Sequence, residues 1–270
     1  MSAGLSRILV AVAGLPVVLG FVWLGGWWLF TLVAFAAALA LHELYSVTHS
    51  LRPLVLAGYV GALLALAGAE AGGSAWMVGG FLVTPALAFV LKGFADTRVP
   101  TTVSVGVTVL GAAWIGLGLA HMLLIRDIPA HAQLASFTVL LAVFAGDTMA
   151  YLAGRLFGRH KLAPRTSPGK TWEGFLVGTA TTILVVFFAL YDERGDFLAI
   201  WQALVLGAVI AAVAPLGDLF ASAVKRDMQV KDFSGLLAGH GGMLDRIDAL
   251  LFAAPALYYV LAAFDLIRTP

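Results

Sequence analysis

The sequence predicts an all-α integral membrane protein with about nine transmembrane helices. Of its 270 residues, 61% are hydrophobic and only 11% are charged, against roughly 25% charged residues in a soluble domain. The apolar runs are continuous, whereas the strands of a membrane β-barrel alternate apolar and polar residues. The chain contains no cysteine, so it offers neither a disulfide framework nor thiol chemistry.

Nine apolar segments approach the roughly 20 residues that a helix needs to cross the hydrocarbon. The first follows Arg7 and imitates a signal peptide, but no small-residue cleavage site comes after it, so we expect a retained helix. Gly25 and Gly26 alone separate it from the second segment, which predicts a tight helical hairpin. The nine segments are 8–24, 27–46, 53–69, 75–92, 101–125, 133–154, 173–191, 199–221 and 248–265.

Lysine and arginine predict the orientation, because the cytoplasmic loops of membrane proteins are rich in both. If the N-terminus is cytoplasmic, all but three of the 16 basic residues fall on the cytoplasmic side. We therefore expect a multi-pass protein of the cell (inner) membrane, with its N-terminus inside and its C-terminus outside. The three outer basic residues are Arg126, Arg194 and Arg268.

The polar residues divide the chain unevenly. Residues 1–140 hold few charges within apolar segments and are predicted to form transmembrane scaffold helices. His42 and Glu43, in the second segment, are interpreted as a satisfied polar pair near the cytoplasmic interface, with a functional site as the alternative. Residues 141–270 hold nearly all the reactive groups and are predicted to form the catalytic half, within a single membrane domain.

Four carboxylates lie within or at the rim of apolar segments. A carboxylate at such depth is costly unless it is paired or binds a metal, so each is a candidate functional group, with a structural ion pair as the alternative. The spacing places Asp218, Ser222 and Lys225 on one helix face, and Asp245 and Asp248 are expected to project together. Two carboxylate pairs from different helices predict a magnesium site. The four residues are Asp147, Asp218, Asp245 and Asp248.

The stretch 222–248 gathers cations, acids and glycines at the end of a membrane helix, a combination typical of a phosphate-and-metal site. Its glycines allow tight turns or a close approach of the backbone to a ligand. His240 is expected to contact substrate rather than metal, because the aspartates already supply hard ligands. The charged residues are Lys225, Arg226, Asp227, Lys231, Asp232, Asp245, Arg246 and Asp248, and the glycines are Gly235, Gly239, Gly241 and Gly242.

A second basic element, the loop 155–172, lies on the same side. Positive-inside topology and attraction to anionic headgroups account for its charge alone, but its hydroxyls and glycine add directional donors for phosphate. The Gly-Lys-Thr fragment is not a Walker A motif, because Pro164 stands where the first glycine is required and no βαβ unit surrounds it. We expect phosphate binding by Arg155, Arg165, Ser167 and Lys170.

The stretch 222–248 resembles the signature of the phosphatidate cytidylyltransferase family. Ala238 stands where that family usually has proline. The matching residues are Ser222, Lys225-Arg226, Lys231-Asp232, Ser234, Leu237, His240-Gly241-Gly242 and Asp245-Arg246-Ile247-Asp248. Upstream, the matches are Asp147 with Tyr151, Gly154-Arg155, Gly158-Arg159, Ser167-Pro168, Lys170-Thr171-Trp172-Glu173-Gly174 and Gly217-Asp218. The resemblance covers about residues 144–250.

The resemblance implies a magnesium-dependent nucleotidyltransferase of phospholipid biosynthesis, which condenses CTP with phosphatidic acid to give CDP-diacylglycerol and pyrophosphate. It implies a catalytic set of Asp218, Lys225, Arg226, Lys231, Asp232, His240, Asp245, Arg246 and Asp248, with Asp218, Asp245 and Asp248 holding Mg²⁺. It implies a substrate-binding set of Asp147, Arg155, Arg165, Ser167, Lys170, Ser222, Gly241 and Gly242. A second cation and the assignment of each basic loop to one substrate stay open.

The expected partners are CTP, phosphatidic acid and the lipid bilayer, and no nucleic acid; family members also suggest a homodimer. Two alternatives stand beside this interpretation. A transporter or channel would spread its acids through the membrane depth and over both sides, whereas these cluster on one side. Another lipid phosphotransferase, such as a polyprenol or dolichol kinase, is distinguished by its nucleotide. The Asp-rich array of the CDP-alcohol phosphotransferases is not found in the sequence.

Overall fold

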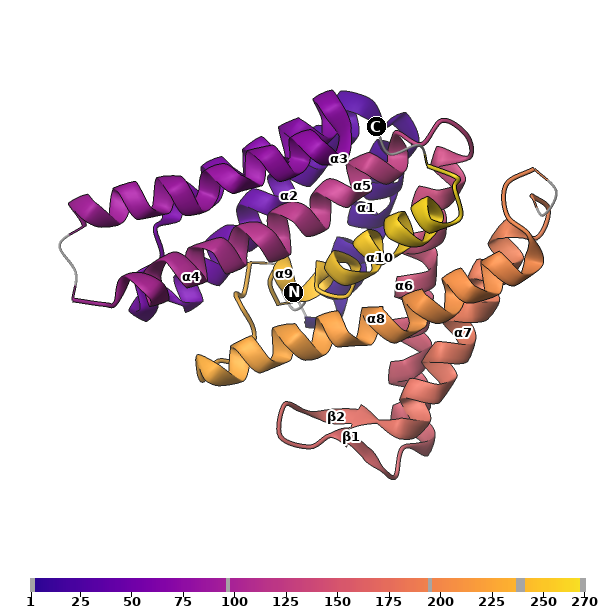
Figure 1. Ribbon diagram of the computed structural model, residues 1–270. Helices are drawn as coiled ribbons and strands as arrows, with labels where there is room; N and C mark the ends of the chain where they lie inside the picture. The colour runs from indigo at the N-terminus through magenta and orange to yellow at the C-terminus, as the bar shows by residue number, and fades with distance from the viewer. Residues whose placement is uncertain (1–2, 96–97, 194–195, 237–240, 268–270) are drawn as a thin grey trace. The chain divides into compact units, whose positions relative to one another are not determined.

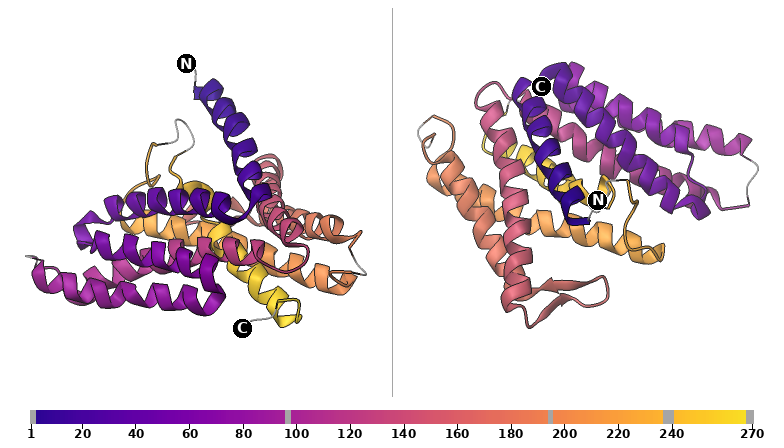
Figure 2. Two further views of the ribbon diagram at one scale, coloured as in Figure 1. Left: turned by 90° about the horizontal axis from the view of Figure 1, so that it is seen from above. Right: turned by 180° about the vertical axis from the view of Figure 1, so that it is seen from behind.

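The computed structural model describes residues 3–95, 98–193, 196–236 and 241–267, with side chains from residue 14 onward. Helices dominate, and seven of those in the described part are long and apolar enough to cross a membrane. The chain divides into two compact units. Unit 1 comprises residues 1–127, 228–247 and 269–270, and unit 2 comprises 128–227 and 248–268. Figure 1 labels the elements, and Figure 2 gives two further views.

Unit 1 begins with two helices joined by a tight turn, α1 (Ala3–Leu24) and α2 (Gly26–Val47). Gly25 between them has φ 65°, in the left-handed region that favours glycine. The guanidinium of Arg126 donates to the carbonyls of Val22 and Trp23, both at 3.1 Å, and so satisfies two acceptors at the end of α1. The tight turn predicted at the glycine pair is therefore present, but Figure 2 shows α1 projecting away from α2, so the two helices do not form the predicted hairpin.

After a short 3₁₀ turn, η1 (His49–Leu51), the chain enters α3 (Val55–Phe94), which is itself a helical hairpin. The backbone leaves helical geometry at Gly72 and Gly73. The second half then returns along the first, so that a side chain at Gly61 would collide with Thr84. The third and fourth predicted apolar segments are the two halves of this one element.

The next membrane-length helix of unit 1 consists of three parts: α4 (Thr101–Gly111), the π-helical η2 (Ala112–Leu117) and α5 (Gly118–Arg126). Within the π-helical part, the ring of Trp114 meets that of Phe233 edge-on, with centroids 6.3 Å apart. π-helical turns often mark functional positions. Here the turn packs against the segment 228–247, which also contains the short helix α9 (Leu244–Ile247).

Unit 2 is built from four helices: α6 (Ala132–Phe157), α7 (Trp172–Leu190), α8 (Ile200–Asp227) and α10 (Leu250–Ala263). Figures 1 and 2 show α6 and α7 side by side. Their backbones approach closely because small residues face each other, as where Gly178 lies against Ala150. Helix α8 runs about two turns past its predicted end, so Lys225 lies on the helix.

A two-stranded antiparallel hairpin joins α6 to α7, with β1 (Lys161–Ala163) and β2 (Ser167–Thr171) (Figure 1). Lys161 pairs with Thr171, and Ala163 pairs with Ser167. The prediction of a loop at 155–172 is wrong for these eight residues. The strands escape prediction because they are short, polar and interrupted by Pro168 and Gly169.

The seven candidate membrane helices contain eight of the nine predicted apolar segments, since α3 holds two. The remaining segment, 8–24, lies in α1, of which Gly14–Leu24 counts as a shorter apolar helix. The coarse prediction of an all-α, multi-pass membrane protein is confirmed. The first break between the compact units falls after Asp127, and residues 228–247 group with the N-terminal helices. The division into scaffold residues 1–140 and catalytic residues 141–270 stays a prediction.

Candidate active site

Three aspartates of unit 2 come from separate elements. Asp147 lies on α6 and Asp218 on α8, while Asp248 lies in the turn before α10. Gly217 brings α8 against the chain at Asp248, because a Cβ at this glycine would collide with the carbonyl of Asp248. The charge of Asp218 acts on both of the other two carboxylates. The three acids therefore form one electrostatic cluster, which we call the acid cluster.

Lys170, at the end of the β-hairpin, reaches the acid cluster. Its ammonium group lies 2.8 Å from Oδ2 of Asp218 and donates to the carbonyl of Pro215 at 3.4 Å. The side chains of Lys170 and Asp218 are 23% and 35% exposed, so water screens the pair only partly. The hairpin is thus connected to α8 through an ion pair within unit 2.

One face of α8 supplies the other members of the site. The hydroxyl of Ser222 donates to Oδ1 of Asp218 at 3.3 Å, as the four-residue spacing predicts. Lys225 is only 9% exposed and Asp248 only 8%, and the charge of Lys225 acts on Asp248. Buried charges persist when they have partners of opposite sign. The sequence prediction of a shared face at Asp218, Ser222 and Lys225 is confirmed.

The acidic and basic groups of this site are unequal in number. Asp147, Asp218 and Asp248 supply three carboxyl groups, against the two ammonium groups of Lys170 and Lys225. An excess of carboxylate over ammonium suits a cation, and Mg²⁺ commonly uses only one or two carboxylates together with substrate phosphates. In the described part of the chain, no three histidine or acidic side chains gather into a ready-made metal-binding group. The donors therefore fit a cation that shares its coordination with a phosphate ligand.

Glu173, in the first turn of α7, fixes the start of the β-hairpin. Its carboxylate accepts the backbone N–H groups of Arg159 and His160 at 3.1 and 3.3 Å, and it contacts Nδ1 of His160 at 2.6 Å. Thr171 caps the same helix by accepting from the N–H of Gly174 at 3.2 Å. These contacts set the direction in which the hairpin leaves α7.

The predicted phosphate-binding residues lie on or near this hairpin. Arg165 is exposed at its turn, and Ser167 opens β2. Arg155, at the end of α6, is exposed and donates to the hydroxyl of Tyr151 at 3.2 Å. Arg226 of α8 donates to the carbonyl of Thr166 at 3.4 Å, which brings the guanidinium group of Arg226 to the hairpin. Unit 2 thus joins a basic hairpin to the acid cluster.

The rest of the signature segment belongs to unit 1. Lys231, Asp232 and Arg246 have exposed side chains. Gly241 has φ 77°, which a residue with a side chain rarely adopts. His240 lies outside the described residues, and its predicted contact with substrate stays a prediction.

Asp245 binds the backbone of its own segment. Its Oδ2 accepts the N–H of Gly242 at 2.9 Å and the N–H of Phe233 at 3.1 Å. Asp245 and Asp248 lie in the helical stretch Leu244–Ala263, in which only Asp248 and Ala249 separate α9 from α10. That these two aspartates project together stays a prediction, as does the role of Asp245 as a metal ligand.

Glu43 lies on α2 as predicted, but the sequence did not indicate its partners. Its side chain is 2% exposed, and its partners are Ser234, Met243 and Leu244, whereas His42 is exposed. The prediction of a satisfied polar side chain is confirmed for Glu43, and these partners lie in the segment 228–247. The available signal was a carboxylate inside an apolar segment, the same signal that singled out Asp147.

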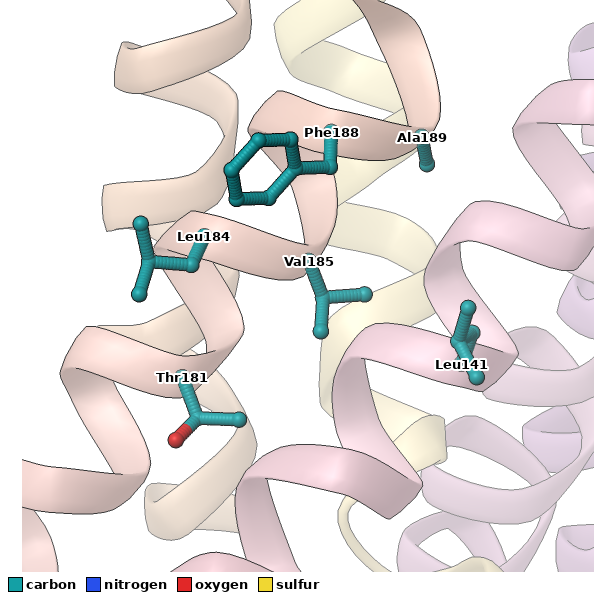
Figure 3. Close-up of a pocket in the computed structure, with 6 residues that line it drawn as sticks. All are labelled: Leu141, Thr181, Leu184, Val185, Phe188 and Ala189. Carbon is teal, nitrogen blue, oxygen red and sulfur yellow. The ribbon is translucent and has the colours of Figure 1, made fainter.

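A pocket of about 430 Å³ opens between α6 and α7 (Figure 3). Five of its six lining residues are apolar, and the hydroxyl of the sixth, Thr181, donates to the carbonyl of Val177 at 2.9 Å. The lining therefore lacks the charged donors that a nucleotide requires. The residues are Leu141, Thr181, Leu184, Val185, Phe188 and Ala189.

A membrane-helix unit with an acid cluster, two lysines and an attached basic hairpin defines the class of site found in membrane enzymes that act on phosphates. The family described as the cytidylyltransferase family matches residues 5–264. The chain belongs to this family.

Relatives with curated names agree with this result. The chain is 40% identical over 134 residues to a phosphatidate cytidylyltransferase of Haemophilus influenzae, covering 48% of this chain and 46% of the relative. It is 39% identical over 153 residues to one of Staphylococcus haemolyticus, covering 56% and 57%. It is 35% identical over 162 residues to one of Bacillus subtilis, covering 60% of each. The chain thus spans about half the length of the curated relatives it matches.

Proposed function

We propose that this protein is a phosphatidate cytidylyltransferase, which transfers the CMP moiety of CTP to phosphatidic acid and releases pyrophosphate. The observation that carries the proposal is the acid cluster with its two lysines, in a chain that belongs to the cytidylyltransferase family. The names of the curated relatives supply the substrates.

The reaction needs no covalent intermediate with the protein. A phosphate oxygen of the lipid attacks the α-phosphorus of CTP and forms the new P–O bond. The bond from that phosphorus to the oxygen bridging it to the β-phosphate breaks, and both of its electrons leave with pyrophosphate. Such a transfer depends chiefly on positioning and on neutralisation of charge. Fixed lysines and arginines can supply both.

Basic residues on the hairpin and on α8 are suited to these tasks. We assign Lys225 and Arg226 to the triphosphate, with Lys231 and His240 as further predicted contacts. Lys170, held by Asp218, is placed to bind a phosphate oxygen without losing its orientation. Arg155, Arg165 and Ser167 are assigned to the phosphatidate headgroup or to the far end of the triphosphate.

Mg²⁺ is the proposed cofactor. Asp218 and Asp248 are the residues that would hold it, with Asp147 orienting them and Asp245 as a predicted third ligand. When bound, the ion supplies positive charge against the phosphates of the substrates. The support from the described residues is the excess of carboxylates over lysines around Asp218.

We further propose nine transmembrane segments and a cytoplasmic N-terminus, with the active site on the cytoplasmic side of the cell (inner) membrane, where CTP is available. The asymmetry of lysine and arginine supports this orientation. A homodimer is proposed from the family resemblance alone, and light scattering of the protein in detergent measures it.

The deciding experiment uses the full-length protein in liposomes that contain phosphatidic acid, with CTP labelled at the α-phosphate. We expect label in CDP-diacylglycerol and release of one pyrophosphate per product, in the presence of Mg²⁺ and not in excess EDTA. ATP, GTP and UTP should give little product. Parallel liposomes with polyprenol or dolichol in place of phosphatidic acid serve as the acceptor control, with CTP labelled at the γ-phosphate, because a lipid kinase transfers that phosphate.

Phosphorylation of the polyprenol or dolichol would replace this proposal with a lipid kinase. No transfer to any acceptor, by protein that is shown to be folded, would contradict a transferase altogether and favour the transport alternative.

A further inference from the structure

A carboxylate from the N-terminal half is buried against the signature segment. Glu43 lies near the end of α2 and is 2% exposed. Its Oε1 accepts the hydroxyl of Ser234 at 2.6 Å and the N–H of Met243 at 2.8 Å, and its Oε2 accepts the N–H of Leu244 at 2.8 Å. Both oxygens are therefore engaged by donors 191 to 201 residues away in the sequence.

These contacts lie beside residues of the predicted site. Leu244 precedes Asp245, whose Oδ2 accepts the N–H groups of Phe233 and Gly242. A Cβ on Gly242 would come within 2.5 Å of Oε2 of Glu43. Glu43 and Asp245 therefore hold the same two stretches of backbone, one at 233–234 and the other at 242–245.

The chemistry of this arrangement favours positioning over catalysis. A buried carboxylate is costly unless its oxygens are hydrogen-bonded. Both oxygens of Glu43 already accept hydrogen bonds from the signature segment. Charge-assisted bonds of this kind are stronger than neutral ones and fix geometry more tightly. Phe233 adds an apolar anchor, because it is 3% exposed and packs against Trp114.

We propose that Glu43 is a positioning residue for the signature segment. By fixing the backbone of 242–245, it sets the orientation of Asp245 and of the Gly241–Gly242 turn for the transfer reaction. The part of this proposal that concerns catalysis rests on the proposed function. The part that concerns the segment rests on the contacts of unit 1 alone.

The test compares E43Q with H42Q, because His42 is an exposed neighbour on the same helix. E43Q keeps the volume of the side chain but places an amide donor where an N–H or hydroxyl must be accepted. We expect E43Q to lower kcat by about 10- to 100-fold, as loss of an orienting partner commonly does. H42Q should keep the kcat and KM of the unaltered protein.

Hydrogen–deuterium exchange measures the segment independently of turnover. In E43Q, peptides that cover 241–247 should exchange faster, whereas peptides from α3, α6 and α7 should be unchanged. Equal acceleration in every helix would overturn the proposal, because Glu43 would then stabilise the whole fold rather than this segment. Unchanged exchange at 241–247 together with kcat within twofold would also overturn it.

If E43Q fails to fold, S234A removes one of the three donors and leaves the carboxylate in place. We expect a local increase in exchange at 241–247 with a smaller loss of kcat than in E43Q, and no local increase would contradict the proposal. The two hypotheses remain separable. An unaltered protein that makes no CDP-diacylglycerol refutes the proposed function, while the exchange measurements still decide whether Glu43 positions the segment.

Discussion

The ammonium group of Lys170 lies 2.8 Å from a carboxylate oxygen of Asp218, which joins the β-hairpin to α8. Because the same carboxylate also accepts from Ser222, it is restrained from two sides. A lysine and an aspartate held in this way keep their positions when a phosphate and a cation arrive. This pair is therefore the most informative place to test the site.

We expect K170M and D218N each to lower kcat/KM by about 100-fold, the scale for losing one preorganised charged partner. The kcat/KM of the double variant should be close to that of the less active single variant, because the effects of residues that act as a unit are not additive. Steady-state kinetics on all three measures this. K161M is the control, since Lys161 is exposed on the same hairpin. Losses that multiply in the double variant would show that the two residues act independently.

Asp248 is expected to govern the response to Mg²⁺. D248N keeps the shape of a buried side chain and the acceptor used by the N–H of Ala249, but removes a hard anionic ligand. We predict that half-maximal activity needs more Mg²⁺ and that kcat falls by about 100-fold. A magnesium titration at fixed CTP measures both. D265N, an exposed position after α10, is the matched control, and an unchanged titration midpoint in D248N would remove Asp248 from the metal site.

Glu173 should control the order of the β-hairpin. E173Q weakens the contacts to the N–H groups of Arg159 and His160. We expect faster amide exchange in peptides covering 158–163 and a loss of activity of about 10-fold. D192N, exposed beyond the other end of α7, should change neither. If exchange rises while activity holds, the hairpin is not required in one fixed orientation.

Two glycines of the signature segment provide a matched pair. A Cβ at Gly242 would press on the carboxylate of Glu43, whereas a Cβ at Gly235 would meet open space. We therefore predict that G242A lowers kcat by about 100-fold, since a displacement of about 1 Å at a catalytic segment has that effect, and that G235A stays within twofold. Equal activity in the two variants would show that the approach of Glu43 to Gly242 does not matter for turnover.

The sequence predicted the membrane helices well because a long apolar run has few other stable states in a bilayer. The segment 133–154 became α6 (Ala132–Phe157), and the face of α8 with Asp218 and Ser222 followed from helical periodicity. The apolar run alone ended at residue 221, because charged residues at the membrane surface carry no apolar period, and only the spacing of Asp218, Ser222 and Lys225 indicated that α8 continues.

The failures have a common physical cause: they depend on contacts distant in the sequence. The β-hairpin is fixed partly by Glu173 and Lys170, whose partners are not sequence neighbours. The three donors to Glu43 lie near the other end of the chain. No local sequence pattern predicts which residues are the partners, although an acidic residue in an apolar helix indicates that it has a partner.

The grouping of residues 228–247 with the N-terminal helices determines which fragments and chimaeras of this protein can fold. The contiguous C-terminal stretch that holds most of the signature is not a self-sufficient module, because α2 and the π-helical turn hold part of it. Severing the chain between α5 and α6 would separate Glu43 from all three of its donors. Chimaeras with related proteins should therefore exchange α2 and residues 228–247 together, as a pair.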